Sequence, residues 1–202
     1  THLDAYTRAS NSAMSRLTAM DSTLGDIVDK ITKGLTAVVG AQGSEASQLT
    51  RDAAALTLQG VRDAIAGDIN TSFNGSYLFS GSKATTQPYG GGPGAWLYQG
   101  DTTVVSVNIE QNRTATIAMD GQAILKGSDP SDLLTVLDGL VTAVQAHDIA
   151  GMASGVDALN RAFTRATNAQ AEVGINENRV TDAEAHLATL STDAMKRLSQ
   201  DQ

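Results

Sequence analysis

The feature that most constrains the fold of this chain is a long apolar repeat in its first forty residues. Apolar or small residues recur there mostly at alternating steps of three and four, at Leu3, Tyr6, Ser10, Ala13, Leu17, Met20, Leu24, Ile27, Ile31 and Leu35. This spacing places them on one face of a helix, and its average of about 3.5 residues is the coiled-coil period. We therefore expect one helix over about residues 3–39, roughly 55 Å long at 1.5 Å per residue.

A second helix is expected after Gly40 and Gly43, which would end the first. Ser44 is the predicted N-cap of this second helix. The helix is predicted to end near Asn74-Gly75, where glycine can adopt the left-handed conformation. Its apolar positions are Leu49, Ala53, Leu56, Val61, Ile65, Ile69 and Phe73.

The last third of the chain also has a helical pattern. Asp129 is the predicted N-cap of a short amphipathic helix, with Pro130 at its first position and Asp132 in its first turn. A weak break near His147 separates it from a longer helix. If that helix is unbroken to Leu198, it extends on the order of 70 Å. Its apolar positions are Met152, Val156, Leu159, Phe163 and Ala166, followed at seven-residue steps by Val173, Val180 and Leu187.

The segment between these helical flanks has a different composition. All three prolines and nine of the nineteen glycines fall between Gly75 and Pro130, so this segment is predicted to be a separate region. Two alternating runs lie on either side of a turn at Gln111-Asn112 and predict a β-hairpin. The alternating positions are Val105, Val107 and Ile109, then Ala115, Ile117 and Met119. Shorter alternations at 77–79 and 95–98 predict further strands, and the glycine-rich run 90–94 predicts an exposed loop.

These patterns together predict a mainly α fold with a β insert. The expected architecture is an elongated antiparallel bundle of long, heptad-patterned helices with a small central β-rich domain. Residues 1–74 and 129–202 would form a discontinuous helical rod domain, and residues 75–128 would form the β-rich insert domain.

Composition excludes several classes of function. The formal net charge of −8 and the pI near 4.7 disfavour a nucleic-acid partner, which would require clustered Lys and Arg. The absence of cysteine excludes disulfides, cysteine-ligated zinc and cysteine nucleophiles. No run of about 18 apolar residues occurs, so we expect no membrane span.

The sequence also lacks a recognisable catalytic pattern. His2, His147 and His186 are far apart, and none has a second histidine at metal-ligand spacing. Ser80 lacks the glycine two positions earlier that a nucleophile elbow requires. The glycine run from Gly90 precedes a predicted strand rather than a helix, so it does not have the context of a phosphate loop. We therefore expect no metal, no cofactor and no enzymatic activity.

The segment 70–81, with the sequence Asn-Thr-Ser-Phe-Asn-Gly-Ser-Tyr-Leu-Phe-Ser-Gly, resembles the flagellar hook–filament junction proteins of the flagellin superfamily. The positions that match this family, also called hook-associated protein 3, are Asn70, Thr71, Gly75, Tyr77, Leu78, Phe79, Ser80 and Gly81. Pro88-Tyr89, the run 98–101 and the helical run 173–179 are similar to the same family. The resemblance covers essentially the whole chain and implies a fragment that lacks both terminal segments.

The resemblance implies a structural role in the bacterial flagellum. A protein of this kind would form a ring of copies between hook and filament, in contact with another hook-associated protein and with flagellin. It would be exported through the flagellar secretion system, with an export chaperone as a further partner, and would be located outside the cell. Two alternatives stay open. Phe73-Asn74-Gly75 resembles filament flagellin, and long antiparallel helices also occur in periplasmic sensor domains.

Overall fold

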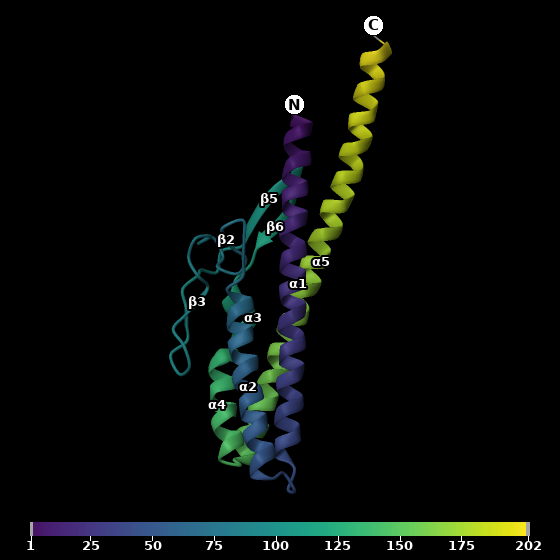
Figure 1. The fold of residues 1–202 in the computed structure, drawn as a ribbon. Coiled ribbons are helices and arrows are strands. Elements are labelled where there is room, and N and C mark those ends of the chain that lie inside the picture. The colour runs from purple at the N-terminus through teal and green to yellow at the C-terminus, as the bar shows by residue number, and fades with distance from the viewer. Residues whose placement is uncertain (1, 201–202) are drawn as a thin grey trace.

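The computed structural model describes residues 2–200 and shows a long helical rod with β-hairpins on one side (Figure 1). The helices are α1 (His2–Gln42), α2 (Gln48–Ile69), α3 (Gly121–Leu125), α4 (Leu133–Gln145) and α5 (Ile149–Gln200). The strands are β1 (Ser72–Phe73), β2 (Ser76–Tyr77), β3 (Tyr89–Gly90), β4 (Leu97–Tyr98), β5 (Val105–Glu110) and β6 (Arg113–Ala118). The predicted fold class, mainly helical with a central β region, is confirmed.

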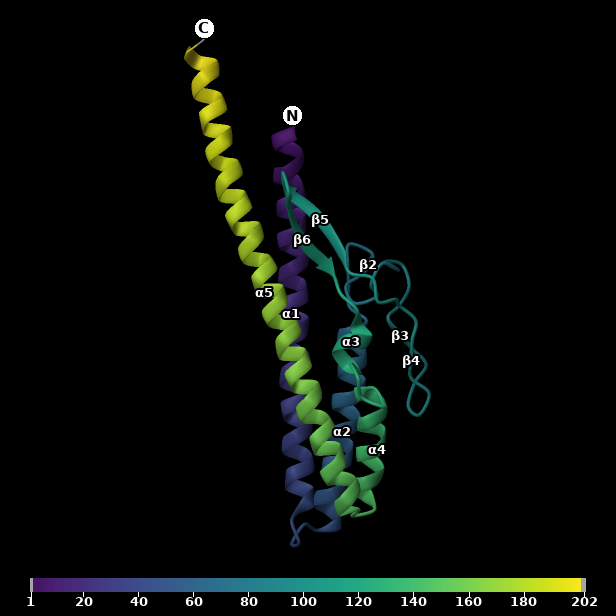
Figure 2. The same cartoon turned by 180° about the vertical axis from the view of Figure 1, so that it is seen from behind.

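Four helices form the lower half of the rod. α1 packs against α2 and α5, and α4 packs against the same two helices, so the four make a four-sided bundle. Figure 2 shows that α1 and α5 continue beyond this bundle as a pair and that α5 extends past the N-terminal end of α1. The 52 residues of α5 correspond to about 78 Å of helix.

The apolar repeat of α1 forms the core along most of the rod. From Ser10 to Ile31 every predicted position of the repeat is buried, because residues three and four apart share one helical face. Near the end of α1, Gly34 and Val38 face the interior and Leu35 is only half-buried. The predicted positions Val173, Val180 and Leu187 of α5 are also buried, as the seven-residue step requires.

The predicted apolar face of α2 was wrong in its first half. Leu49 and Leu56 are 79% and 68% exposed, and Ala53 is exposed as well. The sequence contains a second set of apolar residues at helical spacing, and this set packs into the bundle: Ala54, Leu58, Val61, Ile65 and Ile69. The two registers look alike in sequence because Leu49 and Leu56 are apolar although exposed, and because exposed Ala53 adjoins buried Ala54.

Both predicted ends of α2 also require correction. Ser47, not Ser44, is the N-cap, and its Oγ accepts a hydrogen bond of 3.1 Å from the backbone N–H of Thr50. The helix ends at Ile69 rather than near Asn74-Gly75. Those two residues form the turn between β1 and β2, with φ of 50° and 77°. Two successive positive φ values suit a tight hairpin turn of type I′, and the same residue types also favour helix ends.

The start of α4 lies three residues later than predicted. Asp132 is its N-cap and accepts a 3.0 Å hydrogen bond from the backbone N–H of Thr135. Asp129 is not a cap, and Pro130 precedes the helix. The Asp129 carboxylate instead pairs with two arginines of α5. The predicted break near His147 is confirmed, since this residue has φ of 53° and separates α4 from α5.

The β region consists of three antiparallel hairpins, β1–β2, β3–β4 and β5–β6, and its first strand lies before residue 75, where the insert was expected to begin. The β5–β6 hairpin turns at Gln111-Asn112 as predicted, and Asn112 takes φ of 61° there. This hairpin lies along the upper part of the rod, where β5 contacts α1 and both strands contact α5 (Figures 1 and 2). Over residues 2–200, none of the helices has the combination of length and apolar character that a membrane-crossing segment needs.

Candidate functional site

The residues that match the family pattern lie where α2 passes into the insert. Asn70 caps the C-terminal end of α2, and its side chain bonds to the backbone of Tyr89 in strand β3. Thr71 accepts a backbone hydrogen bond from Leu78, which closes the β1–β2 hairpin. Gly75 lies at the tip of that hairpin, and an added Cβ there would meet no atom within 4 Å.

The middle of the motif is fully buried. Leu78, Phe79 and Ser80 each have 0% exposed surface. Their backbone pairs with the segment that joins β6 to α3: the N–H of Met119 donates to the carbonyl of Leu78 at 3.1 Å, and the N–H of Gly121 donates to that of Phe79 at 2.9 Å. Residues 78–80 therefore form an extended segment at the centre of the junction, and this segment connects α2 and the hairpins to α3.

Gly81 ends the buried stretch in a conformation that favours glycine. Its φ is 65°, and a Cβ at this position would lie 2.3 Å from the carbonyl oxygen of Asp101. The Asp101 carboxylate accepts hydrogen bonds from the side chain and backbone of Ser82 and from the backbone of Thr103, and these lower its pKa to about 2. The Tyr98 hydroxyl lies 3.1 Å from the carbonyl oxygen of Phe79, inside the same junction.

A buried arginine of α1 provides a second connection between rod and insert. Arg16 donates from Nη2 to the carbonyl oxygen of Tyr77 at 2.7 Å and from Nε to that of Ile117. One guanidinium thus holds the β1–β2 and β5–β6 hairpins against the same helix. Its burial lowers the pKa of Arg16 from its ordinary value.

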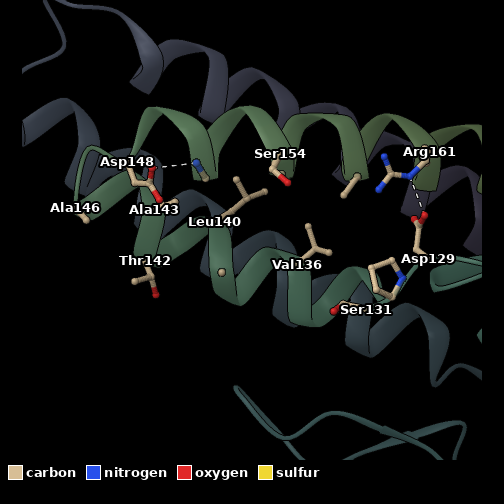
Figure 3. Close-up of a pocket in the computed structure, with 15 residues that line it drawn as sticks. Asp129, Ser131, Val136, Leu140, Thr142, Ala143, Ala146, Asp148, Ser154 and Arg161 are labelled. Carbon is tan, nitrogen blue, oxygen red and sulfur yellow. Dashed lines mark hydrogen bonds and ion pairs between the residues drawn. The ribbon is translucent and has the colours of Figure 1, made fainter.

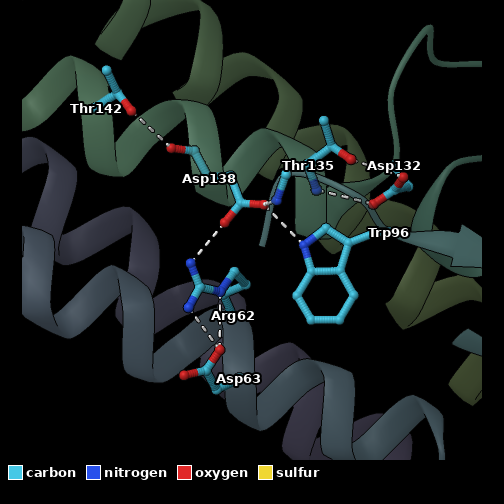
Figure 4. A network of polar contacts seen from close by, with 8 residues as sticks. Arg62, Asp63, Trp96, Asp132, Thr135, Asp138 and Thr142 are labelled. Carbon is cyan, nitrogen blue, oxygen red and sulfur yellow. Dashed lines mark hydrogen bonds and ion pairs between the residues drawn. The ribbon is translucent and has the colours of Figure 1, made fainter. Parts of the chain in front are cut away.

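A third connection centres on Asp138 of α4 (Figure 4). Its Oδ1 accepts from Arg62 Nη1 of α2 at 2.7 Å. Its Oδ2 accepts from the backbone N–H of Gly94 at 2.8 Å and from the indole N–H of Trp96 at 2.9 Å. The glycine-rich loop between β3 and β4 is therefore bonded to the bundle through one carboxylate.

Sequence reasoning did not find the groups that make these connections. Arg16, Arg62 and Asp138 each lie on a predicted helix, where a charged residue is normally solvated. The sequence does contain one indication that these arginines are buried: Arg16 is next to Leu17 of the apolar repeat, and Arg62 is next to Val61. A charge at the edge of a core face can bury its head group only if carbonyl or carboxylate partners meet it.

Within residues 2–200, no cluster of three His, Cys, Asp or Glu side chains has the arrangement to hold a metal ion. His147 and His186 are exposed, and His186 Nδ1 contacts the carboxylate of Glu110 at the tip of the β5–β6 hairpin. The polar contacts described above go mainly to backbone carbonyls and fix the position of the insert.

The fold is that of an elongated helical protein, a rod of long antiparallel helices with hairpins fixed to its side. Residues 1–84 match the family described as the bacterial flagellin N-terminal helical region. The chain is similar to flagellar hook-associated protein 3 of Escherichia coli (strain K12), with 24% identity over 198 residues. That alignment covers 87% of this chain and 62% of the relative, so the chain spans about three-fifths of the relative's length.

Solved structures of flagellar proteins share this fold. The crystal structure of FlgL from Xanthomonas campestris matches with a TM-score of 0.90 and 16% identity, over 98% of each chain. The flagellar junction protein FlgL from Legionella pneumophila matches with a TM-score of 0.76 and 12% identity, over 90% of this chain and 96% of that one. The resemblance to hook-associated protein 3 that segment 70–81 indicated is thereby confirmed.

Proposed function

We propose that this chain is part of a structural subunit that joins the hook to the filament of the bacterial flagellum. The observation that carries the proposal is the agreement of sequence and fold, since hook-associated protein 3 relatives match over nearly the whole chain. Copies would pack side by side and end to end through their helices, and would form a ring. Such a subunit requires no catalytic group and no cofactor.

The two parts of the chain would have different roles. The helical rod, residues 1–74 and 129–202, offers long lateral faces for packing against other copies. The β-rich insert, residues 75–128, would sit on the outside of that packing. The matched residues 70–81, with Arg16 and Asp138, would hold the insert at a fixed position on the rod.

The partners and location follow from the same proposal. The subunit would contact another hook-associated protein on the hook side and flagellin on the filament side. It would reach that position outside the cell through the flagellar secretion system, escorted inside the cell by an export chaperone. Nucleic acid and membrane have no place in this role, which is consistent with the net charge of −8.

Filament flagellin is the second candidate, because the matched family over residues 1–84 is a flagellin region. Deletion of the gene separates the two. For a junction subunit, we expect cells with hooks but no filaments, and flagellin released into the medium. Filaments of altered length or shape that remain attached to hooks would instead identify a flagellin. Flagella of normal structure and number would contradict both.

A further inference from the structure

The groove between α4 and α5 offers a ligand no unpaired charge (Figure 3). Three charged residues line it, and each has a partner within the described part of the chain. Asp129 bonds to Arg161 at 2.8 Å, and Asp148 accepts from the backbone N–H of Gly151 at 3.0 Å. The other lining residues are small or apolar. A group with reactivity of its own lies instead at the turn of the β1–β2 hairpin.

That turn consists of Asn74 and Gly75, the single Asn-Gly pair of the sequence. Both residues are exposed, and their φ values are 50° and 77°. Within residues 2–200, the side-chain amide of Asn74 and the backbone N–H of Gly75 have no hydrogen-bond partner. A Cβ added at Gly75 would meet no atom within 4 Å. The amide carbon of Asn74 and the backbone nitrogen that follows it are therefore both open to reaction.

The hairpin around this turn opens at low cost. Its two strands have two residues each, and so short a hairpin has little stability of its own. Asn74 also holds a left-handed conformation, which residues other than glycine disfavour. The bonds that fix the hairpin lie at its base, from the N–H of Leu78 to the carbonyl of Thr71 and from Arg16 to the carbonyl of Tyr77. The turn can therefore open locally while the junction stays folded.

From these features we propose that Asn74 is a site of spontaneous deamidation. The backbone nitrogen of Gly75, after it loses its proton to a base in solution, attacks Cγ of Asn74. The N–Cγ bond forms, the Cγ–Nδ2 bond breaks, and the amide nitrogen takes up a proton from water and leaves as ammonia. Water then opens the resulting succinimide ring. Opening at Cγ gives aspartate, and opening at the main-chain carbonyl gives isoaspartate, in which the backbone runs through Cγ.

Other turns of the chain have only part of this arrangement. Asn112 is also exposed at a hairpin turn, with φ of 61°, but Arg113 follows it and its side chain hinders the backbone nitrogen. Gly121 follows Asp120, but Gly121 is buried and its N–H donates a 2.9 Å hydrogen bond to a backbone carbonyl. Asn74 has both a following glycine and free access, so it should react first.

The isoaspartate form alters the hairpin itself. It adds a carbon to the backbone of a two-residue turn, and the geometry of such a turn fixes the pairing of Phe73 with Ser76. The next residue is Tyr77, whose carbonyl oxygen accepts from Arg16 at 2.7 Å. The modification therefore loosens the hairpin close to the point where Arg16 holds it against the rod. This reaction is independent of the flagellar role.

Peptide mass mapping of the full-length protein, aged in warm and mildly alkaline buffer, tests the proposal. Samples taken over time, from folded protein and from protein unfolded in urea, give the rate of amide loss at each asparagine. We expect Asn74 to react first, with isoaspartate among the products, and Asn112 to keep its amide. The rate at Asn74 in the folded protein should lie within about tenfold of the unfolded rate, which corresponds to an opening cost below about 1.4 kcal/mol.

Two variants separate the chemistry at the nitrogen from the opening of the turn. Gly75→Ala favours opening, because alanine disfavours positive φ, yet its Cβ hinders the nitrogen, so amide loss at Asn74 should be severalfold slower. Arg113→Gly gives Asn112 a following glycine and should make it react.

An Asn74 amide that is lost in urea but kept in the folded protein overturns the proposal, since the fold would then protect it. Equal rates at Asn74 and Asn112 also overturn it, because the following glycine would then have no part. Urea titration tests the loosening: aged protein should be less stable than fresh Asn74→Asp protein, which carries the charge on a normal backbone. Equal stability of the two would contradict the altered hairpin.

Discussion

Asn70 bonds to the backbone of Tyr89 through both polar atoms of its side chain. Its Oδ1 accepts from the Tyr89 N–H at 2.8 Å, and its Nδ2 donates to the Tyr89 carbonyl oxygen at 2.9 Å. An amide side chain thereby takes the place of a neighbouring strand and fixes β3 to the end of α2. Only a side chain with one donor and one acceptor can make both bonds.

The variant Asn70→Asp keeps the shape and removes the donor. A carboxylate would then face the Tyr89 carbonyl oxygen, so we expect a loss of about 1–3 kcal/mol in the free energy of unfolding. Urea titration followed by circular dichroism measures this loss. Asn178→Asp, at an exposed position of α5, is the matched control and should change stability by less than about 0.5 kcal/mol. Equal stability of the two variants would show that the Asn70 bonds contribute nothing.

Gly81→Ala should destabilise the junction more than Gly75→Ala does. Both glycines have positive φ, 65° and 77°, so alanine carries a conformational cost of about 1 kcal/mol at each. Only at Gly81 would the new Cβ also lie 2.3 Å from the carbonyl oxygen of Asp101, whereas at Gly75 it has open space. Thermal unfolding of the two variants compares them directly, and an equal fall in Tm would contradict the close contact.

The core face of α1 is tested by Leu24→Asp. Leu24 has 0% exposed surface, and an unpaired charge there should cost more than about 4 kcal/mol and prevent folding. Leu56→Asp makes the same change at a residue that is 68% exposed, and it should leave the fold intact. Circular dichroism and thermal melting distinguish the two. A Leu24→Asp chain that melts like the parent would refute the assigned face.

Asp129 should make stability depend on pH in the acid range. Its partial burial alone would raise its pKa, but hydrogen bonds from Arg165 and Arg161 lower it below the ordinary value of 3.8. A lowered folded-state pKa gives stability that is present above about pH 4 and is lost as the pH falls through the folded-state pKa. Asp129→Asn should therefore lose about 1–2 kcal/mol at pH 7.

The difference between Asp129→Asn and the parent should shrink below pH 4, because Asp129 of the unfolded parent chain then binds a proton while the folded chain still holds the charged carboxylate. Urea titrations at pH 7, 5 and 3 measure it. Asp193→Asn removes a carboxylate that is 57% exposed and 4.0 Å from Lys196, so it should have little effect at any pH. A constant difference between Asp129→Asn and the parent from pH 7 to pH 3 would contradict the assigned pKa shift.

The sequence predicted those parts of the fold that depend on periodicity. The repeat from Ser10 to Ile31 and the steps from Val173 to Leu187 were sufficient to place two long helices, because burial of one face is the main source of helix stability. The β5–β6 hairpin was also predicted, since alternation and an Asn turn are local signals. The helix ends were less accurate: Ser44 and Ser47 are both capping residues, and only the packing selects one.

The contacts of the candidate site could not be predicted in the same way. Asp138 accepts from Arg62 on α2 and from Trp96 in the insert, residues that are 76 and 42 positions away in sequence. Such contacts depend on how the insert folds back onto the bundle, which no local pattern encodes. The motif at 70–81 was found by family resemblance, but its bonds to Tyr89, Met119 and Gly121 required the structure.

Immunogold electron microscopy of intact flagella tests the central claim most directly. An antibody raised against the β3–β4 hairpin, which includes the exposed residue Leu97, would label the assembled protein. The proposed junction role predicts gold at one narrow band between hook and filament. Label along the whole filament would identify a flagellin, and flagella without label at the junction would contradict the account.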